Sequence, residues 1–250
     1  MKKIRADELL FLQGKAASRS QAKILIMAGK VRSGPDALVQ KPSQMLPDTT
    51  ELFVETPPRF VSRGGEKMLG AIENFKLDVA GTHALDVGAS TGGFTDCLLQ
   101  HGAADVTCID VGHGQLHEKL RRDPRVTNLE KINARNLDTV ELPREQYDLV
   151  VGDLSFISLK LILVPAWNRV KENGLLVMLI KPQFEATREE VSAVRGIIKD
   201  QKIRDRVIRE ILDFCKTTLP GFCLQNLCES PIHGGDGNVE YLFCAKKTNA

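Results

Sequence analysis

The stretch that decides the fold is His83-Ala-Leu-Asp-Val-Gly-Ala-Ser-Thr-Gly-Gly-Phe-Thr-Asp96. In this stretch an apolar run ends in a glycine-rich turn, and apolar residues then recur at helical spacing (Phe94, Cys97, Leu98). This order predicts a strand, a tight turn and a helix. Glycines in the turn permit positive φ and a close ligand, and the first N–H groups of the helix point towards the turn. We therefore expect a binding site here.

A second apolar run, Val106-Thr-Cys-Ile109, ends at Asp110. A carboxylate about 20 residues beyond such a turn holds the ribose hydroxyls of a nucleoside in dinucleotide-type folds. The turn lacks the G-x-G-x-x-G spacing, because three residues separate Gly88 from Gly92. This counts against NAD and suits a cofactor without a pyrophosphate, such as S-adenosylmethionine. The alternative is a glycine turn that binds nothing, but the strand, helix and Asp110 together favour a nucleoside cofactor.

The composition is that of an ordinary globular protein, with 250 residues of which 42% are hydrophobic and 26% charged. This length suits one large α/β domain, or a small domain and a mid-sized one. No apolar run approaches the roughly 18 residues of a membrane-spanning helix, and the first residues do not form a signal peptide. The six cysteines form no C-x-x-C pair and the five histidines show no metal-ligand spacing. We expect reduced thiols, a cytoplasmic location and no metal.

Positive charge is concentrated at the N-terminus. Residues 1–63 hold 11 Lys and Arg against 6 Asp and Glu, a net +5, and the remaining 23 basic and 26 acidic residues give −3. A basic N-terminal part on a mildly acidic body indicates a polyanionic partner. A lysine-rich surface that serves only solubility is the alternative.

The first 55 residues predict a small module of two helices and a few short strands. The helices are expected at 5–13 and, after the N-cap candidate Ser18, at 21–28, with strands at 30–32, 38–39 and 51–55. The segments Arg5-Ala-Asp-Glu-Leu-Leu, Ser18-Arg-Ser-Gln-Ala and Ile26-Met-Ala-Gly-Lys-Val resemble the S-four-type RNA-binding module. The resemblance implies that Arg5, Arg19, Lys23 and Arg32 face RNA. The alternative is that these residues only solubilise a small helical pair.

A stiff segment follows this module, because Pro57 and Pro58 join neither neighbouring element comfortably. We predict an RNA-binding domain over 1–55, a linker over 56–62 and a second domain over 63–250. Arg59 and Arg63, beside the linker, are further candidates for RNA contacts. The next helix carries Lys67 in its first turn, where a cation opposes the helix dipole and is therefore a candidate for function.

The second domain alternates continuous apolar runs with helical segments. Strands are predicted at 83–87, 106–109, 126–130, 147–151 and 175–180, with helices over 159–169 and 204–212. This alternation favours a parallel sheet that is covered on both faces. Two last strands, near 221–228 and 238–245, are joined by a glycine-rich connection typical of an antiparallel hairpin. A parallel sheet with a reversed last strand is the architecture of S-adenosylmethionine-dependent methyltransferases.

Two lysines and two carboxylates are expected to meet at one edge of this sheet. Asp153 and Lys181 directly follow strands, Glu240 begins the reversed last strand, and Lys67 precedes the first strand of the domain. The carboxyl ends of parallel strands form the ligand-binding edge of such sheets. Each residue alone is more simply a turn residue or a surface ion pair. Together, they could deprotonate a ribose hydroxyl with a lysine whose pKa a second ammonium lowers.

This set resembles the Lys-Asp-Lys-Glu tetrad of RNA ribose 2′-O-methyltransferases of the FtsJ group. With Ser62-Arg-Gly-Gly, Asp153-Leu-Ser-Phe-Ile-Ser and Lys181-Pro-Gln-Phe-Glu, residues 5–245 resemble the TlyA family, which methylates ribosomal RNA and is often labelled hemolysin A. The resemblance implies a Rossmann-like class I methyltransferase sheet behind a small α+β domain, Lys181 as the base, and 2′-O-methylation of a cytidine. The segment 186–200 is less glycine-rich than in relatives.

The resemblance also implies S-adenosylmethionine as cofactor and ribosomal RNA or ribosomal subunits as partners, with no membrane or metal. The cofactor-binding residues that we assign are Asp86, Gly88, Ala89, Ser90, Thr91, Gly92, Gly93, Phe94, Asp110, Val111, Asn133, Ala134 and Asp153. Two other functions remain open at this point, namely a membrane-damaging hemolysin and a ribosome-assembly factor that binds RNA without catalysis.

Overall fold

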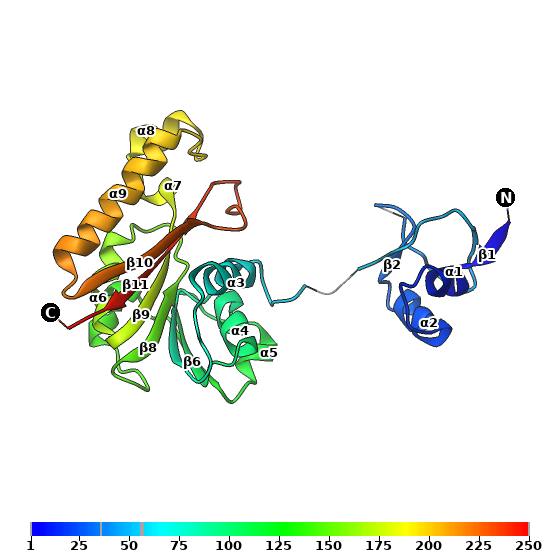
Figure 1. The fold of residues 1–250 in the computed structure, drawn as a ribbon, viewed down its shortest axis with the longest axis horizontal. Coiled ribbons are helices and arrows are strands. Elements are labelled where there is room, and N and C mark those ends of the chain that lie inside the picture. The colour runs from blue at the N-terminus through cyan, green and yellow to red at the C-terminus, as the bar shows by residue number, and fades with distance from the viewer. Residues whose placement is uncertain (1, 36, 56–57, 250) are drawn as a thin grey trace. The chain divides into compact units, whose positions relative to one another are not determined.

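The computed structural model describes residues 2–35, 37–55 and 58–249. The chain forms two compact units, Met1–Pro58 and Arg59–Ala250, which are drawn in Figure 1. The division falls inside the segment 56–62 that the sequence analysis assigns to a linker. Residues 56 and 57 of that segment lie outside the described residues.

The first unit is a helical pair with two small two-stranded sheets. Its elements are β1 (Lys3–Arg5), α1 (Ala6–Leu12), α2 (Arg19–Met27), β2 (Val31–Arg32), β3 (Met45–Pro47) and β4 (Phe53–Val54). β1 pairs with β3 and β2 with β4, both antiparallel. The two predicted helices are confirmed to within two residues, and the Ser18 side chain caps α2 by accepting the Gln21 N–H. Buried residues such as Leu10, Ile26 and Leu52 form a core of their own.

One strand prediction in this unit was wrong, and two short strands were missed. The expected strand at 38–39 is a single bridge between Leu38 and Arg32, and β1 and β3 were not foreseen. β1 and β3 are three residues each, which is too short for an alternating pattern, so only their pairing with each other defines them.

The second unit contains one seven-stranded sheet in the order β10-β11-β9-β8-β5-β6-β7. Its strands are β5 (His83–Val87), β6 (Asp105–Asp110), β7 (Val126–Glu130), β8 (Tyr147–Gly152), β9 (Val170–Ile180), β10 (Phe222–Glu229) and β11 (Tyr241–Lys247). Five neighbouring strands, from β9 to β7, are parallel, and β11 lies antiparallel between β9 and β10. The predicted α/β fold, a mostly parallel sheet with a reversed last strand, is confirmed.

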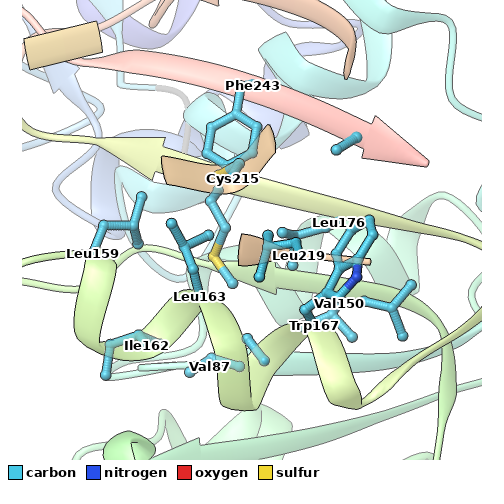
Figure 2. Close-up of a cluster of buried hydrophobic side chains, with 14 of the residues drawn as sticks. Val87, Val150, Leu159, Ile162, Leu163, Trp167, Leu176, Cys215, Leu219 and Phe243 are labelled. Carbon is cyan, nitrogen blue, oxygen red and sulfur yellow. The ribbon is translucent and has the colours of Figure 1, made fainter. Parts of the chain in front are cut away.

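Helices cover both faces of this sheet (Figure 1). The helices are α3 (Gly64–Phe75), α4 (Gly93–Gln100), α5 (Glu118–Arg121), a 3-10 helix (Ala134–Thr139), α6 (Lys160–Asn168), α7 (Pro182–Glu185), α8 (Arg188–Ala193) and α9 (Gln201–Thr218). Side chains alternate across each strand, so Ala84 packs with α3 and α4 while Leu85 packs with α6 and α9. The buried side chains on each face form a hydrophobic core. Figure 2 shows the core on the face of Leu85, to which Trp167 and Leu163 of α6, Cys215 of α9 and Phe243 of β11 belong.

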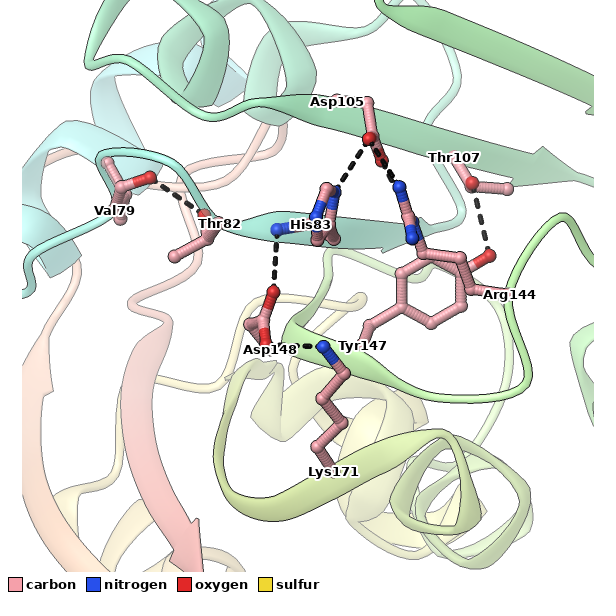
Figure 3. A network of polar contacts seen from close by, with 9 residues as sticks. All are labelled: Val79, Thr82, His83, Asp105, Thr107, Arg144, Tyr147, Asp148 and Lys171. Atoms are coloured by element: carbon pink, nitrogen blue, oxygen red, sulfur yellow. Dashed lines mark hydrogen bonds and ion pairs between the residues drawn. The ribbon is translucent and has the colours of Figure 1, made fainter.

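The amino-terminal edge of the sheet is fastened by ion pairs (Figure 3). Asp105 accepts hydrogen bonds from the Arg144 guanidinium at 2.9 Å and contacts the His83 ring at 2.6 Å. Asp148 accepts from the His83 backbone N–H at 2.9 Å and from Lys171 at 2.7 Å. Burial alone would raise the pKa of Asp105, but Arg144 and His83 outweigh it and lower this pKa. This edge therefore holds the strands together.

The carboxyl edge brings the candidate residues together. Val87 lies beside Gly152 in the sheet and Gly152 lies beside Met178, so Asp153 and Lys181 leave neighbouring strands at nearly the same level. Tyr241 pairs with Ile180 across the antiparallel ladder. Glu240, the residue before Tyr241, consequently reaches the same edge.

Candidate active site

The glycine-rich turn forms a tight loop between β5 and α4. Gly88 and Gly92 have φ of 81° and 91°, and Ser90 also has a positive φ of 48°. The Gly88 and Ala89 N–H groups donate to the Ile109 carbonyl at 2.9 and 3.1 Å, which ties the loop to β6. At Gly92 a Cβ would lie 2.3 Å from the Leu120 side chain. The glycine at position 92 is thus required by both backbone conformation and packing.

Two adjoining cavities of about 400 and 580 Å³ open at this loop. Both are lined by Gly88, Ser90, Asp153, Ser155 and Phe156. The smaller cavity is also lined by Asp86, Ala89, Thr91, Gly93 and Phe94 and by the lysines and Glu240, and the larger by Asp110, Val111, Asn133 and Ala134. Every residue that we assign to the cofactor lines one of them except Gly92, which is packed against Leu116 and Leu120.

Asp110 is held in place by the turn that it faces. Its Oδ2 accepts the Ser90 N–H at 2.8 Å, and its Oδ1 accepts the Gly112 N–H at 2.7 Å. Each carboxylate oxygen has a second lone pair for another donor. Since Asp110 lines the larger cavity, it can accept further hydrogen bonds from a ligand there.

The four residues at the sheet edge form one continuous ion-pair chain. Lys67 Nζ donates to Glu240 Oε2 at 2.7 Å and to Asp153 Oδ2 at 3.0 Å. Lys181 Nζ lies 2.6 Å from Asp153 Oδ1 and donates to Ser155 Oγ at 2.8 Å. All four line the smaller cavity, and the Lys67, Lys181 and Glu240 residues are each less than 10% exposed. The structure therefore brings the predicted tetrad together.

The tetrad is ionised in a specific pattern. Burial alone would lower the pKa of Lys67, but the Asp153 and Glu240 carboxylates outweigh burial and raise it. Burial would likewise raise the pKa of Asp153, but Lys181 and Lys67 lower it. Lys67 is thus a fixed cation and Asp153 a fixed anion near neutral pH. The nearby Asp86 differs, because burial raises its pKa to about 7 although Thr95 hydrogen bonds oppose the increase.

Sequence reasoning missed several side chains of this site. Ser155 contacts Lys181, and the Gln183 amide donates to Glu240 Oε1 at 3.4 Å. Phe156 is 91% exposed with a φ of 64°, and its ring centroid lies 5.2 Å from that of Phe184. The motifs containing all four residues are visible in the sequence, but their side chains carry no signal that places them in a cavity.

The predicted RNA contacts are distributed over both units. In the first unit, Arg5 and Arg19 form ion pairs with the buried Asp7, Arg32 pairs with Glu55, and Lys23 is exposed. In the second unit, Arg63 lies at the rim of the smaller cavity, and Arg59 stacks on the Phe60 ring with its carbon Cζ 5.1 Å from the centroid.

The segment from residue 186 to the end of α9 at residue 218 lines neither cavity. It contains α8, which Thr187 and Glu190 cap, and α9, which begins earlier and ends later than predicted. The buried Asn238 side chain accepts the Ile198 N–H and donates to the Gly196 carbonyl, both at 2.9 Å. The segment therefore supports the loop that leads to Glu240. In the ranges 2–35, 37–55 and 58–249 no cluster of three metal-ligating side chains occurs.

Comparison with known proteins agrees with this geometry. A family model described as FtsJ-like methyltransferase matches residues 60–247. The chain is 44% identical to the 16S/23S rRNA (cytidine-2′-O)-methyltransferase TlyA of Mycobacterium tuberculosis, over 97% of this chain and 89% of that protein. It is 40% identical, with a TM-score of 0.73, to a protein of Streptococcus thermophilus described as a candidate hemolysin, covering 100% of this chain and 90% of the other.

A more distant structure shares only the fold. It is a protein of Listeria monocytogenes described as a candidate S-adenosylmethionine-dependent methyltransferase, 17% identical, with a TM-score of 0.54 over 75% of this chain and all of that one. The family match covers the sheet, the glycine-rich turn and all four residues of the tetrad. The chain belongs to the FtsJ-like methyltransferase family and is a close relative of the TlyA proteins.

Proposed function

We propose that this protein transfers the methyl group of S-adenosylmethionine to the ribose 2′-hydroxyl of a cytidine in ribosomal RNA. The observation that carries the proposal is the ion-pair chain of Lys67, Asp153, Lys181 and Glu240 at the mouth of a cavity beside a glycine-rich turn. The names of TlyA relatives, which specify cytidine-2′-O-methylation of ribosomal RNA, support the substrate.

The residues that line the cavities suit the chemistry of the cofactor. Asp110 offers a carboxylate for ribose hydroxyls, and Ile109 and Ile132 form an apolar wall of the same cavity for a flat base. Gly88 lines both cavities with a φ of 81°, which a residue with a side chain rarely adopts, and a Cβ there would also lie 3.2 Å from the Leu154 side chain. When bound, S-adenosylmethionine supplies an electrophilic methyl group on a positively charged sulfur.

Lys181 is the base in this proposal. Its amine accepts the proton of the ribose 2′-hydroxyl, after first losing its own third proton to solvent. Lys67 serves as a fixed positive charge that is paired with Asp153 and Glu240. Asp153 contacts both lysines and holds them in a fixed relation. Most of the rate enhancement comes from positioning the hydroxyl in line with the methyl group, and proton removal adds to it.

The target nucleotide must be unpaired to enter the site, because a ribose within a helix cannot meet a buried methyl group in line. Two features at the rim suit such a nucleotide. Phe156 exposes its ring, on which a base can stack, and Arg63 is an exposed cation for a phosphate. Phosphate contacts from the first unit would add affinity with little sequence information.

The decisive experiment is to map ribose methylation in ribosomal RNA from cells with and without this protein. Purified protein, S-adenosylmethionine and isolated subunits should then restore the missing methyl group in vitro. A ribosome-assembly factor without catalysis would bind the subunits and restore nothing. Because some relatives are named hemolysin, a liposome-leakage assay tests for membrane damage as the second experiment. No helix in the described part of the chain is long and apolar enough to cross a membrane. Leakage without methyl transfer would contradict the proposal.

A further inference from the structure

Ser155 is an uncharged hydrogen-bond partner of the proposed base. Lys181 Nζ donates to Ser155 Oγ at 2.8 Å and contacts Asp153 Oδ1 at 2.6 Å. Ser155 lies two residues beyond Asp153, is exposed, and lines both cavities. It therefore lies where the cofactor cavity and the tetrad meet.

The two lysines of the tetrad differ in one partner. Each contacts one oxygen of Asp153, but the second partner of Lys67 is the Glu240 carboxylate and that of Lys181 is a hydroxyl. A second carboxylate favours the charged ammonium, whereas a neutral hydroxyl adds no such charge. The raised pKa of Lys67 agrees with this difference. A lysine that must lose a proton is better served by the hydroxyl.

The hydroxyl also fixes the direction of the amine. A neutral lysine has two N–H groups and one lone pair. When one N–H group is donated to Ser155 and the other faces Asp153, the lone pair takes the remaining position on the nitrogen. Because Lys181 lines the cavity, that position is available to the substrate hydroxyl. Without Ser155, rotation about the last side-chain bond would leave the lone pair undirected.

The chain around Ser155 is built to hold it there. The next residue, Phe156, has a φ of 64°, which is rare for a bulky side chain and persists only where neighbours enforce it. Glu185 supplies such enforcement, because it accepts the Ser158 hydroxyl at 2.8 Å and the Leu159 N–H at 2.6 Å. Glu185 ends α7, which begins directly after Lys181. The two segments that carry Ser155 and Lys181 are thus joined.

We infer that Ser155 is a positioning residue that selects Lys181, and not Lys67, as the base by aiming its lone pair without adding charge. The inference rests on the proposed function, in which Lys181 removes the ribose proton. Other titratable and charged groups also face Lys181 or the same cavity. They are Asp153 after β8, Lys67 on α3, Glu240 before β11, Asp86 in β5, and Arg63, His233 and Asp236 at the rim. Comparison of variants that keep all of these groups isolates the effect of position 155.

The test is the pH dependence of single-turnover methyl transfer in three variants of the full chain. Ser155→Asp gives Lys181 a second carboxylate, and the midpoint of its pH profile should rise by about 1–3 pH units. Ser155→Thr keeps the hydroxyl and should retain the wild-type profile. Ser155→Ala should lower the plateau rate about tenfold, because the amine is no longer aimed. Ser192→Asp, on the exposed surface of α8, adds the same charge away from the cavities and should change nothing.

The outcomes separate this inference from the proposed function. Wild-type protein that transfers no methyl group to ribosomal RNA would overturn the function itself. Active wild-type protein together with an unmoved midpoint in Ser155→Asp would overturn only the role of Ser155. Should Ser155→Asp fail to fold, the pair Ser155→Thr and Ser155→Ala decides, and equal rates in these two variants would refute the inference. Calorimetric binding of S-adenosylmethionine verifies that each variant retains the cofactor cavity.

Discussion

Asp86 is a buried acid at the end of a hydrophobic strand, and its environment decides its charge. The residue is 1% exposed, and among the described residues Thr95 alone donates hydrogen bonds to its Oδ2, from the backbone N–H and the hydroxyl. Burial therefore raises its pKa to about 7, although Thr95 partly offsets the rise. Near neutral pH the native state must either keep a proton on Asp86 or bury a charge. The burial of Asp86 therefore costs stability once the pH exceeds the pKa of this residue in the unfolded chain.

The first prediction is that Asp86→Asn stabilises the protein relative to wild type, increasingly as pH rises. The native pKa is raised, so the native state binds more protons than the unfolded state, and stability falls as pH rises from about 4 to 7. A rise in pKa from 3.8 to about 7 corresponds to a loss of about 4 kcal/mol in the free energy of unfolding of the wild type as the pH rises. The asparagine variant cannot ionise at this position and should not show this loss. Thermal unfolding at pH 4.5 to 8 measures this, with Asp213→Asn as an exposed control. A constant difference from wild type at every pH would contradict the prediction.

The second prediction concerns Lys181→Met, which removes the amine and keeps the apolar stem. Turnover should fall by about 10²–10⁴, the usual contribution of a positioned base, while S-adenosylmethionine binding remains. Lys171→Met, at the opposite edge of the sheet, is the matched control and should retain activity. Near-normal single-turnover rates in Lys181→Met would transfer the role of base to Lys67.

Three members of the tetrad could be predicted from the sequence because each adjoins a strand and the carboxyl ends of parallel strands meet at one edge. Lys67 lies inside α3 and adjoins no strand, so it was expected only from the helix that leads into the sheet. Asp153, Lys181 and Glu240 are all within one residue of a strand terminus. Ser155 and Gln183 could not be assigned in this way. Whether their side chains turn back towards the lysines depends on loop conformations such as the positive φ of Phe156, and those follow from tertiary contacts.

At the scale of elements, the turn after β5 is shaped by helices on both sides of it. Gly92 is the N-cap of α4 with a φ of 91°, and the buried side chains of Leu116 and Leu120 close over it. The short helix α5, which contains Leu120, was not foreseen because its four residues show no helical period. The loop that lines the cofactor cavity is therefore fixed partly by an element beyond β6.

The third prediction is that Gly92→Ala destabilises the protein much more than Gly81→Ala does. Both glycines have positive φ, of 91° and 71°, but a Cβ at 92 would lie 2.3 Å from Leu120 whereas nothing lies within 4 Å at 81. We expect about 2–4 kcal/mol for Gly92→Ala from strain and overpacking together, and about 1–2 kcal/mol for Gly81→Ala from backbone strain alone. Urea denaturation measures both, and equal losses would show that Leu116 and Leu120 move aside freely.

The parallel strands were predicted well because each is a buried apolar run. The structure differs from the prediction where polar residues interrupt an apolar run, as in β9, or where a helix-capping sequence was overlooked, as in α8. β9 begins at Val170, five residues before the predicted start, because the exposed Glu172 and Asn173 conceal its first part. α8 has a readable start, since Thr187 and Glu190 form a capping box. The antiparallel β11 was expected from the glycine-rich connection before it.

At the scale of the whole molecule, the chain consists of two units with separate cores. Residues 1–58 hold 9 Lys and Arg against 6 Asp and Glu, a net +3, while residues 59–250 have a net −1. Arg5, Arg19 and Arg32 already contact carboxylates, and among the described residues Lys23 forms no ion pair. A cation that is already paired with a carboxylate releases fewer counterions when it binds a phosphate. The contribution of this unit to RNA affinity is therefore limited.

The last prediction is that removal of residues 1–58 leaves a folded unit that binds S-adenosylmethionine but binds RNA more weakly. The second unit keeps its sheet, both helical layers and all residues of the cavities, so its cofactor affinity should not change. One to four phosphate contacts would be lost, which lowers the slope of log affinity against log salt by about 0.7–3. RNA binding at several salt concentrations measures the slope, with full-length Lys181→Met as a control that lacks the base but keeps both units. An unchanged slope would mean that the phosphate contacts belong to the second unit, and Arg59 and Arg63 would then be the residues to substitute.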